Sequence, residues 1–195
     1  MESQNKLFRL DNSNIIISGG AGLLGEQHAR AILMMNGNLV LIDKNFIELK
    51  KIKKKLEYEF NKKITIFKCD VAAYKSVKNI YSKLKKKNFL IDVIINNAAL
   101  NPKFDKSSNL NSTSRLENFS IEMWNKEIAV GLTGAFLCSQ VFGNEMALSR
   151  KGGCIINIAS DLSVISPDQR LYSQKGLEEG LQPVKPITYS VIKSG

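Results

Sequence analysis

A tyrosine and a lysine stand four residues apart near the end of this 195-residue chain. They are Tyr189 and Lys193, within the stretch ITYSVIKSG. Residues at positions i and i+4 share one face of a helix, so the ammonium can lie beside the phenol. A positive charge there favours the phenolate, which can exchange a proton with a substrate oxygen. Pairs at this spacing are common, and the alternative is a packing tyrosine on a surface helix.

A second candidate feature is the glycine-rich string SGGAGLLG over residues 18–25. It follows a short apolar run and opens a segment with helical spacing. Glycines there permit a tight turn and let backbone N–H groups approach a pyrophosphate at the positive end of a helix. Glycine is also ordinary turn material, but this position in a first βαβ unit favours dinucleotide binding. We expect cofactor contacts from Gly19, Gly22, Leu24 and Gly25.

A carboxylate, Asp43, ends the second apolar run. At this place it can accept hydrogen bonds from the adenosine ribose hydroxyls, and it would repel a 2′-phosphate. The alternative is a solvated aspartate in a turn. Lys44 follows and partly offsets the repulsion. The sequence therefore predicts NAD as the cofactor, with NADP as the less favoured choice.

Short apolar runs alternate with longer helical periods along the chain. The pattern predicts strands at residues 14–18, 38–42, 63–67, 89–95 and 154–158, helices at 21–36, 45–60, 73–87 and 121–149, and a loop at 101–118. Runs this apolar are typical of strands buried on both faces of a parallel sheet. The alternation predicts an α/β fold, a Rossmann-type doubly wound sheet in three α/β/α layers. No linker divides the sequence, so we expect a single NAD(P)-binding domain over residues 1–195.

The net charge of +10 is concentrated in one part of the chain. Residues 44–87 contain fifteen lysines against four acidic residues, so the remainder is close to neutral. Only five of the 28 basic residues are arginines, whereas recognition of bases and phosphates favours the arginine fork. The lysines fall on the polar faces of two amphipathic segments. A solvated helix surface is favoured, and no nucleic-acid partner is expected.

The three cysteines, Cys69, Cys138 and Cys154, are far apart and follow no metal-ligand spacing. We therefore expect no metal site, and buried free thiols in a reducing compartment. The N-terminal residues form no apolar leader, and no run of about 18 apolar residues could cross a membrane. The sequence predicts a cytoplasmic protein without a membrane partner.

Further motifs resemble, in order, those of the short-chain dehydrogenase/reductases. Asp70-Val71 resembles the family's adenine-contacting pair, and Asn97-Ala98 lies in NNAA, which resembles its Asn-Asn-Ala-Gly. The run INIAS resembles the strand that ends in the catalytic serine, here Ser160, although a capped strand end is the alternative. The resemblance implies that Ser160 donates a hydrogen bond to the substrate oxygen while Tyr189 exchanges its proton. It also implies cofactor contacts from Asp70, Val71, Asn97, Ala98, Tyr189 and Lys193.

Two positions depart from the family pattern. The spacing Gly19-x-x-Gly22-x-x-Gly25 matches the family's extended branch, whereas the other motifs match its single-domain branch. Gly131 stands where that branch usually has a catalytic asparagine, which kinks the helix and positions a water next to the lysine. A glycine allows the kink but offers no side chain for the relay. We expect reduced rather than abolished turnover from this change alone.

The interval between Ser160 and Tyr189 is longer than the family's usual one. The extra residues, 166–186, are polar and contain three prolines. Tyr172 lies nearer to the serine, but Lys175 follows it one position too early, so Tyr189 remains the expected catalytic residue. The insertion is expected to form a loop over the substrate side of the site. The alternative is a tolerated surface insertion.

The glycine string, the segment LTGAFLCSQ, the insertion and the final stretch look most like the flagellin-modification oxidoreductases of surface-sugar biosynthesis. This resemblance implies an NAD(P)-dependent oxidoreductase that transfers a hydride between a nicotinamide cofactor and a sugar-like alcohol or ketone. It also implies a dimer or tetramer among full-length members. The alternative is a catalytically weak or inactive dinucleotide-binding fragment with a scaffold or regulatory role, and polyanion binding ranks third.

Full-length members continue beyond the lysine with a sixth and a seventh strand. The resemblance therefore predicts a C-terminally truncated chain whose fold lacks the last strands. In that case the fifth strand becomes an exposed, apolar edge of the sheet.

Overall fold

The computed structural model of the chain describes residues 7–100, 114–149 and 151–195. The chain divides into two compact units. The first comprises Met1–Ala98 and Gly134–Ile158, and the second comprises Ala99–Thr133 and Ala159–Gly195. That the two act as a single domain stays a prediction.

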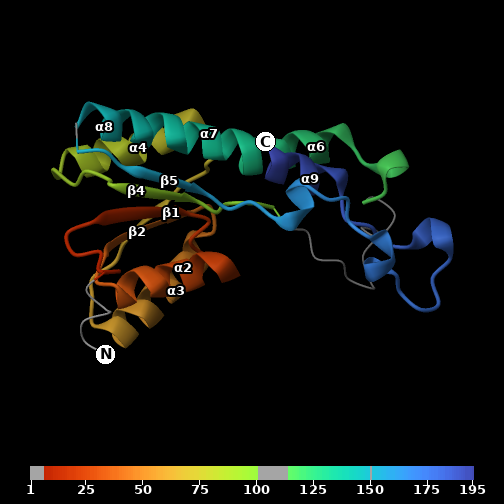
Figure 1. Ribbon diagram of the computed structural model, residues 1–195, viewed down its shortest axis with the longest axis horizontal. Helices are drawn as coiled ribbons and strands as arrows, with labels where there is room; N and C mark the ends of the chain where they lie inside the picture. The colour runs from red at the N-terminus through yellow and green to blue at the C-terminus, as the bar shows by residue number, and fades with distance from the viewer. Residues whose placement is uncertain (1–6, 101–113, 150) are drawn as a thin grey trace. The chain divides into compact units, whose positions relative to one another are not determined.

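The first unit is a parallel sheet in the order β3-β2-β1-β4-β5, with helices on both faces (Figure 1). Its strands are β1 Asn14–Ser18, β2 Asn38–Asp43, β3 Thr65–Lys68, β4 Val93–Asn96 and β5 Cys154–Asn157. The helices α2 Leu23–Met34 and α3 Phe46–Phe60 cover one face, and α4 Tyr74–Lys85, α7 Gly134–Cys138 and α8 Asn144–Leu148 cover the other. The Rossmann-type α/β fold predicted from the sequence is confirmed.

The three inner strands are buried because they carry uninterrupted apolar residues. Ile16 of β1 pairs in register with Val40 of β2 and with Ile94 of β4, and all three are fully buried. The covering helices bury one stripe each, as an amphipathic period requires, for example Leu49 and Leu56 of α3. This core places the carboxyl ends of β1, β2 and β4 at one edge of the unit.

Two strands begin later than their apolar runs suggest. Phe89 is not in β4, because its N–H donates to Leu84 O at 3.0 Å and closes the end of α4. Ile64 lies just before β3, and its N–H, which points away from β2, donates to the carboxylate of Glu57 at 2.8 Å.

The outer strand β5 contradicts the expectation that all strands are buried on both faces. All four of its residues are exposed, with Ile155 at 43% and Ile156 at 41%. It pairs with β4 on one side, and it is the last strand of the described sheet. The exposed apolar edge predicted for the fifth strand is thereby confirmed.

The cysteines are free, but they are not all buried. Cys69 and Cys138 are buried, and burial raises the pKa of both thiols, that of Cys138 to about 12. Cys154 is exposed on β5, so the prediction of burial was wrong for this residue, because β5 lies at the edge of the sheet. Within the described ranges, no group of His, Cys, Asp or Glu side chains could hold a metal ion, and no helix is long and apolar enough to cross a bilayer.

The described residues of the second unit include two α-helices, a π-helical turn and several 3-10 turns. The helices α6 Ile121–Ile128 and α9 Ile187–Ser194 contact one another. The predicted helix at 121–149 contains two π-helical turns, Ala129–Thr133 and Ser139–Gly143, so it is not one regular α-helix. Of the predicted loop at 101–118, residues 101–113 lie outside the described part, and Leu116–Asn118 form a 3-10 turn.

Gly131 lies in the π-helical turn Ala129–Thr133 and is covered by α9. A Cβ atom at this position would lie 2.5 Å from Cγ2 of Ile192. Atoms cannot approach this closely, so Ile192 occupies the space that a side chain at position 131 would need. The glycine is therefore a packing requirement of α9 in this chain, as well as a departure from the family pattern.

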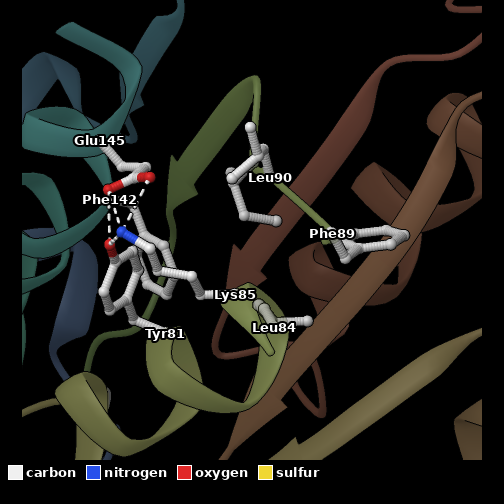
Figure 2. A pocket seen from close by; sticks show the side chains of 8 residues that line it. Tyr81, Leu84, Lys85, Phe89, Leu90, Phe142 and Glu145 are labelled. Atoms are coloured by element: carbon white, nitrogen blue, oxygen red, sulfur yellow. Dashed lines mark hydrogen bonds and ion pairs between the residues drawn. The ribbon is translucent and has the colours of Figure 1, made fainter. Parts of the chain in front are cut away.

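A hydrogen-bond network between side chains joins α4 to α8 in the first unit. Tyr81 donates to the carboxylate of Glu145, and Lys85 donates to the Tyr81 oxygen at 2.9 Å (Figure 2). These two partners hold the pKa of Glu145 below its usual value, first through the Tyr81 hydrogen bond and then through Lys85. The adjacent cavity, lined also by Phe142, has a volume of only about 10 Å³, the space of a single water molecule. The Tyr81–Lys85 pair therefore reads as a structural contact and offers no room for a ligand.

We expect Glu145→Gln to lower the free energy of unfolding by about 1 kcal/mol at neutral pH, because a charged acceptor is replaced by a neutral one. A lowered carboxyl pKa gives stability that is present above the ordinary value and is lost as the pH falls through the folded-state value. The difference between variant and wild type should therefore shrink on acidification. Urea denaturation from pH 7 to pH 3 measures it, with the exposed Glu178→Gln as control. A constant difference over this range would contradict the assignment.

We expect Gly131→Asn to destabilise the chain by about 1–3 kcal/mol, because the new side chain overlaps Ile192. The double variant Gly131→Asn, Ile192→Ala removes the overlapping atoms, and it should recover stability relative to the sum of the two single changes. Thermal unfolding of the four proteins gives the coupling energy. Additive effects would show that Ile192 does not exclude a side chain at position 131.

Candidate active site

The glycine string forms the turn between β1 and α2. Gly19 has a φ of +67°, in the left-handed region that favours glycine. Gly22 is the N-cap of α2, and no side chain caps this helix end. Leu23 and Leu24, in the first turn, are exposed. Their N–H groups lie at the positive end of the helix, where an anion is stabilised.

Two further glycines let the backbone approach itself closely here. A Cβ atom at Gly25 would overlap the carbonyl oxygen of Gly19 and lie 2.9 Å from Gly20 Cα. A Cβ atom at Gly20 would lie 2.9 Å from Leu41 Cβ of β2. Gly22, by contrast, has nothing nearer than 3.4 Å. Gly25 is thus needed for helix packing, and Gly20 is a required glycine that the sequence motif does not single out.

A side-chain clamp holds this turn against the end of β4. Ser18 Oγ accepts hydrogen bonds from the N–H groups of Asn97 at 3.0 Å and Ala98 at 3.1 Å. The Asn97 side chain donates to Ser18 O at 3.0 Å and to Gly19 O at 3.1 Å. Asn97 and Ala98 therefore lie at the glycine turn, where the amide of Asn97 bonds to the turn itself, and their contact with a cofactor stays a prediction. Ser18 was not among the predicted site residues, although its place before the glycines is the signal that could have identified it.

The carboxylate of Asp43 supports the same turn. One oxygen accepts from Ala21 N at 2.9 Å, and the other accepts from Asn45 N at 2.7 Å. Each oxygen keeps a further lone pair, so the group can still accept a hydroxyl. Asp43 thus lies at the glycine turn, and its contact with an adenosine ribose stays a prediction.

Lys44 forms an ion pair with Asp70 rather than standing apart. Its ammonium lies 2.8 Å from Asp70 Oδ2, and this contact lowers the pKa of Asp70. The same carboxylate accepts from Ala72 N at 3.1 Å, and Val71 beside it is buried. The positive charge next to Asp43 is therefore shared with a second carboxylate.

These residues fit a dinucleotide. The glycine turn packs tightly against the end of β4, because a Cβ atom at Gly19 would lie only 2.8 Å from Ala98 Cα. An uncapped helix N-terminus and a carboxylate after β2 complete the donor and acceptor set for a pyrophosphate and a ribose.

The second unit holds Tyr189 and Lys193 on α9, which begins after Pro186. The Lys193 ammonium lies 5.8 Å from the centroid of the Tyr189 ring. A second ammonium, that of Lys185 in the insertion, lies over the same ring at 3.7 Å. Burial lowers the pKa of both lysines, and for Lys193 the positive charge of Lys185 lowers it further. The sequence did not indicate Lys185, which precedes Tyr189 by four positions.

Ser160 caps the 3-10 turn Asp161–Ser163, and this turn contacts α9. Its hydroxyl donates to Asp161 Oδ1 at 2.8 Å and accepts from Leu162 N at 3.3 Å. Ser194 of α9 donates to Ser163 O at 2.7 Å, which fastens the two elements together. The turn after Ser160 therefore contacts the helix that carries Tyr189, and the catalytic role of the serine stays a prediction.

A buried carboxylate, Glu127 of α6, supports the start of α9. It is 2% exposed and accepts a hydrogen bond from Thr188, which is also buried. Its negative charge acts on Lys185 in the direction that raises the pKa of that lysine. No sequence signal identified Glu127, because it occupies an ordinary position of an amphipathic helix.

The insertion lines a groove beside α9. Two glutamine side chains hold the backbone of the insertion. Gln182 Oε1 accepts a hydrogen bond from Gln174 N at 2.7 Å, and Gln169 Oε1 accepts one from Lys185 N at 2.8 Å. The groove has a volume of about 410 Å³. Its lining includes Arg115, Ser166, Gln169, Lys185 and Ser190. The insertion thus lies against α9. The groove lining includes Ser190, which follows Tyr189 in the sequence.

Residues 13–173 match the profile of a protein family described as short chain dehydrogenase. Among curated relatives, the short chain dehydrogenase/reductase dpmpG of Macrophomina phaseolina is 30% identical over 81% of this chain and 86% of its own length. The NAD-dependent glycerol dehydrogenase of Listeria innocua is 25% identical over 86% of this chain and 60% of its own. The post-translational flagellin modification protein A of Campylobacter coli is 26% identical over 95% and 68%.

Solved structures share the fold. A putative D-mannonate oxidoreductase from Haemophilus influenza with bound NAD superposes with a TM-score of 0.75 at 22% identity, covering 98% of this chain and 64% of that one. A gluconate 5-dehydrogenase from Burkholderia cenocepacia, in complex with NADP and tartrate, gives 0.76 at 21% identity, with 98% and 64% covered. The chain thus spans about two thirds of these solved chains. With the profile match over most of its length, the chain belongs to the short-chain dehydrogenase family of oxidoreductases.

Proposed function

We propose that this chain is an NAD(P)-dependent oxidoreductase that transfers a hydride between a nicotinamide cofactor and a sugar-like alcohol or ketone. The observation that supports the proposal is the second unit's geometry. There α9 presents Tyr189 beside two ammonium groups, and the turn of Ser160 is fastened to the same helix. We assign the catalytic roles to Ser160, Tyr189 and Lys193.

The first unit is proposed to hold the dinucleotide. The N–H groups at the start of α2 would bind the pyrophosphate, with Gly19, Gly22, Leu24 and Gly25 forming the turn around it. Asp43 would accept the adenosine ribose hydroxyls. When bound, the nicotinamide supplies or accepts the hydride. Asp70, Val71, Asn97 and Ala98 are proposed to complete the contacts.

NAD is the proposed cofactor rather than NADP. Asp43 places a negative charge at the position where a 2′-phosphate would lie. Lys44, the nearest positive charge in sequence, is already paired with Asp70 at 2.8 Å. Its charge therefore offsets the repulsion less than an unpaired lysine would.

Proton transfer is assigned to Tyr189. Its phenol would give or take a proton at the substrate oxygen, and two ammonium groups lie near its ring. A lysine with a lowered pKa releases a proton more readily, which suits Lys193 as the next group in the relay. Ser160 would turn its hydroxyl from Asp161 to the substrate oxygen, and Lys193 would also bind the nicotinamide ribose.

The proposed substrate is polar and rich in hydroxyl groups. The groove beside α9 offers the guanidinium of Arg115, the amide of Gln169 and the hydroxyl of Ser166, which suit a polyol or a sugar. The names of the glycerol and gluconate dehydrogenases among similar proteins agree with this class. Because one relative is a flagellin modification protein, we propose surface-sugar biosynthesis as the process in which this chain acts. We further propose a cytoplasmic location and a homo-oligomer of the full-length protein.

A second candidate function is dinucleotide binding with weak or no turnover. Ile192 fills the space beside Gly131, where the family resemblance places an asparagine of the proton relay. A chain without that relay could still bind the cofactor through its first unit. It would then act as a scaffold or regulatory protein.

We expect Tyr189→Phe to reduce turnover by about 10²–10⁴-fold while NADH binding is retained, because only the proton-transfer group is removed. The measurement is NADH formation or consumption with a panel of polyols and ketoses, beside NADH fluorescence titration. Tyr172→Phe is the matched control and should keep the wild-type rate. Turnover of Tyr189→Phe near the wild-type rate would contradict the assignment. NADH binding without turnover of the wild-type chain would favour the second candidate.

We expect Asp43→Asn to reduce the preference for NADH over NADPH by about fivefold, because one short-range repulsion is removed. The amide oxygen can still accept from Ala21 N, whereas the hydrogen bond from Asn45 N is lost. Fluorescence titration with both cofactors gives the two dissociation constants. Asp11→Asn, an exposed change before β1, should leave their ratio unchanged. An unchanged ratio in Asp43→Asn would place the 2′-phosphate away from this carboxylate.

A further inference from the structure

An open groove runs along β3, the other outer strand of the described sheet. It has a volume of about 800 Å³ and lies wholly within the first unit. Lys53 and Glu57 of α3 line one part, Lys87 lines another, and residues 61–67 form the remainder. Ile66 and Phe67 of the strand are half-buried, so the groove has an apolar floor between charged walls.

The backbone of β3 presents hydrogen-bonding groups to this groove. Cys69 N donates to Asp43 O at 2.9 Å, so residue 69 faces β2. Because successive residues of a strand face opposite sides, the N–H groups of Ile66 and Lys68 point away from β2. Ile64 has the same outward direction, and its N–H already donates to the carboxylate of Glu57 at 2.8 Å. The chain itself thus shows a carboxylate bound on this edge.

Positive charge surrounds the edge on both faces of the sheet. Lys53 belongs to α3, which covers one face, whereas Lys87 follows α4, which covers the other. Lys83 of α4 lies over the Phe67 ring at 6.0 Å from its centroid. Four lysines and one glutamate line the groove. Across the ranges that the structure describes, the ion pairs include Lys53 with Glu57 at 3.5 Å but neither Lys63 nor Lys87.

We propose that the β3 edge binds an acidic peptide segment of a partner protein, which adds to the sheet as an extended strand. The outward N–H groups and the apolar floor suit a peptide backbone. The alternating side chains of an added strand would reach the lysines on both faces. A second copy of this chain would bring the same lysines and be repelled. A nucleic acid has no peptide backbone that could pair in register with the outward N–H groups of β3. The groove lining also contains no arginine.

The test uses the 195-residue chain and a fluorescein-labelled decapeptide of glutamate with valine at every third position. Fluorescence anisotropy at low salt measures binding, and added salt screens it. The double variant Lys53→Gln, Lys87→Gln should bind about tenfold more weakly. The matched control Lys54→Gln, Lys86→Gln removes two exposed neighbouring lysines outside the groove, and it should bind within about twofold of wild type. Thermal unfolding verifies that both variants fold.

Two further probes separate strand addition from general attraction of negative charge. The same peptide with every backbone nitrogen methylated keeps its charge but loses all the donors of an edge strand, so its binding should be lost. An oligouridylate of equal charge should bind more weakly than the peptide. Absence of peptide binding, equal losses in the two double variants, or equal binding of the methylated peptide or the oligouridylate would each overturn the proposal. All of these readouts are independent of turnover and cofactor binding.

Discussion

The start of α2 lies so close to the preceding turn that Gly25 has no room for a side chain. This close approach fixes where the helix begins and points its first N–H groups out of the turn. Ser18 and Asn97 hold the turn from β1 and β4, and Asp43 holds it from β2. Three strand ends therefore converge on one backbone loop. The rest of the first unit, including its buried central strands, serves to keep these ends in register.

The second unit shows how one departure from a family pattern is accommodated by another residue. Gly131 leaves a space in a π-helical turn, and Ile192 of α9 fills it. The helix that carries Tyr189 and Lys193 packs against α6. At the start of this helix, Thr188 donates a hydrogen bond to the buried Glu127. Lys185 then adds a second positive charge over the Tyr189 ring. Packing and charge around the tyrosine come from residues that no motif names.

The two outer strands of the described sheet differ in chemistry. The edge at β5 is apolar and exposed, which is a liability for aggregation. The edge at β3 is bordered by lysines and is partly capped by the carboxylate of Glu57. Like charges along β3 oppose pairing with another copy of the same strand. The lysine-rich composition of residues 44–87 thus has a structural consequence at one edge as well as on solvated helix faces.

The sequence by itself determined the order of strands and helices, because apolar period and glycine placement are local properties. Asn14–Ser18 and the helix at Phe46–Phe60 illustrate this, since each lies within a residue of its prediction. It also singled out Asp43, Ser160, Tyr189 and Lys193 by type and spacing, and their roles stay predictions. Contacts between residues distant in sequence could not be predicted in this way. Only the tertiary structure decided three features, because each depends on which elements become neighbours. They are the exposure of Cys154, the Lys44–Asp70 ion pair and the packing of Ile192 against Gly131.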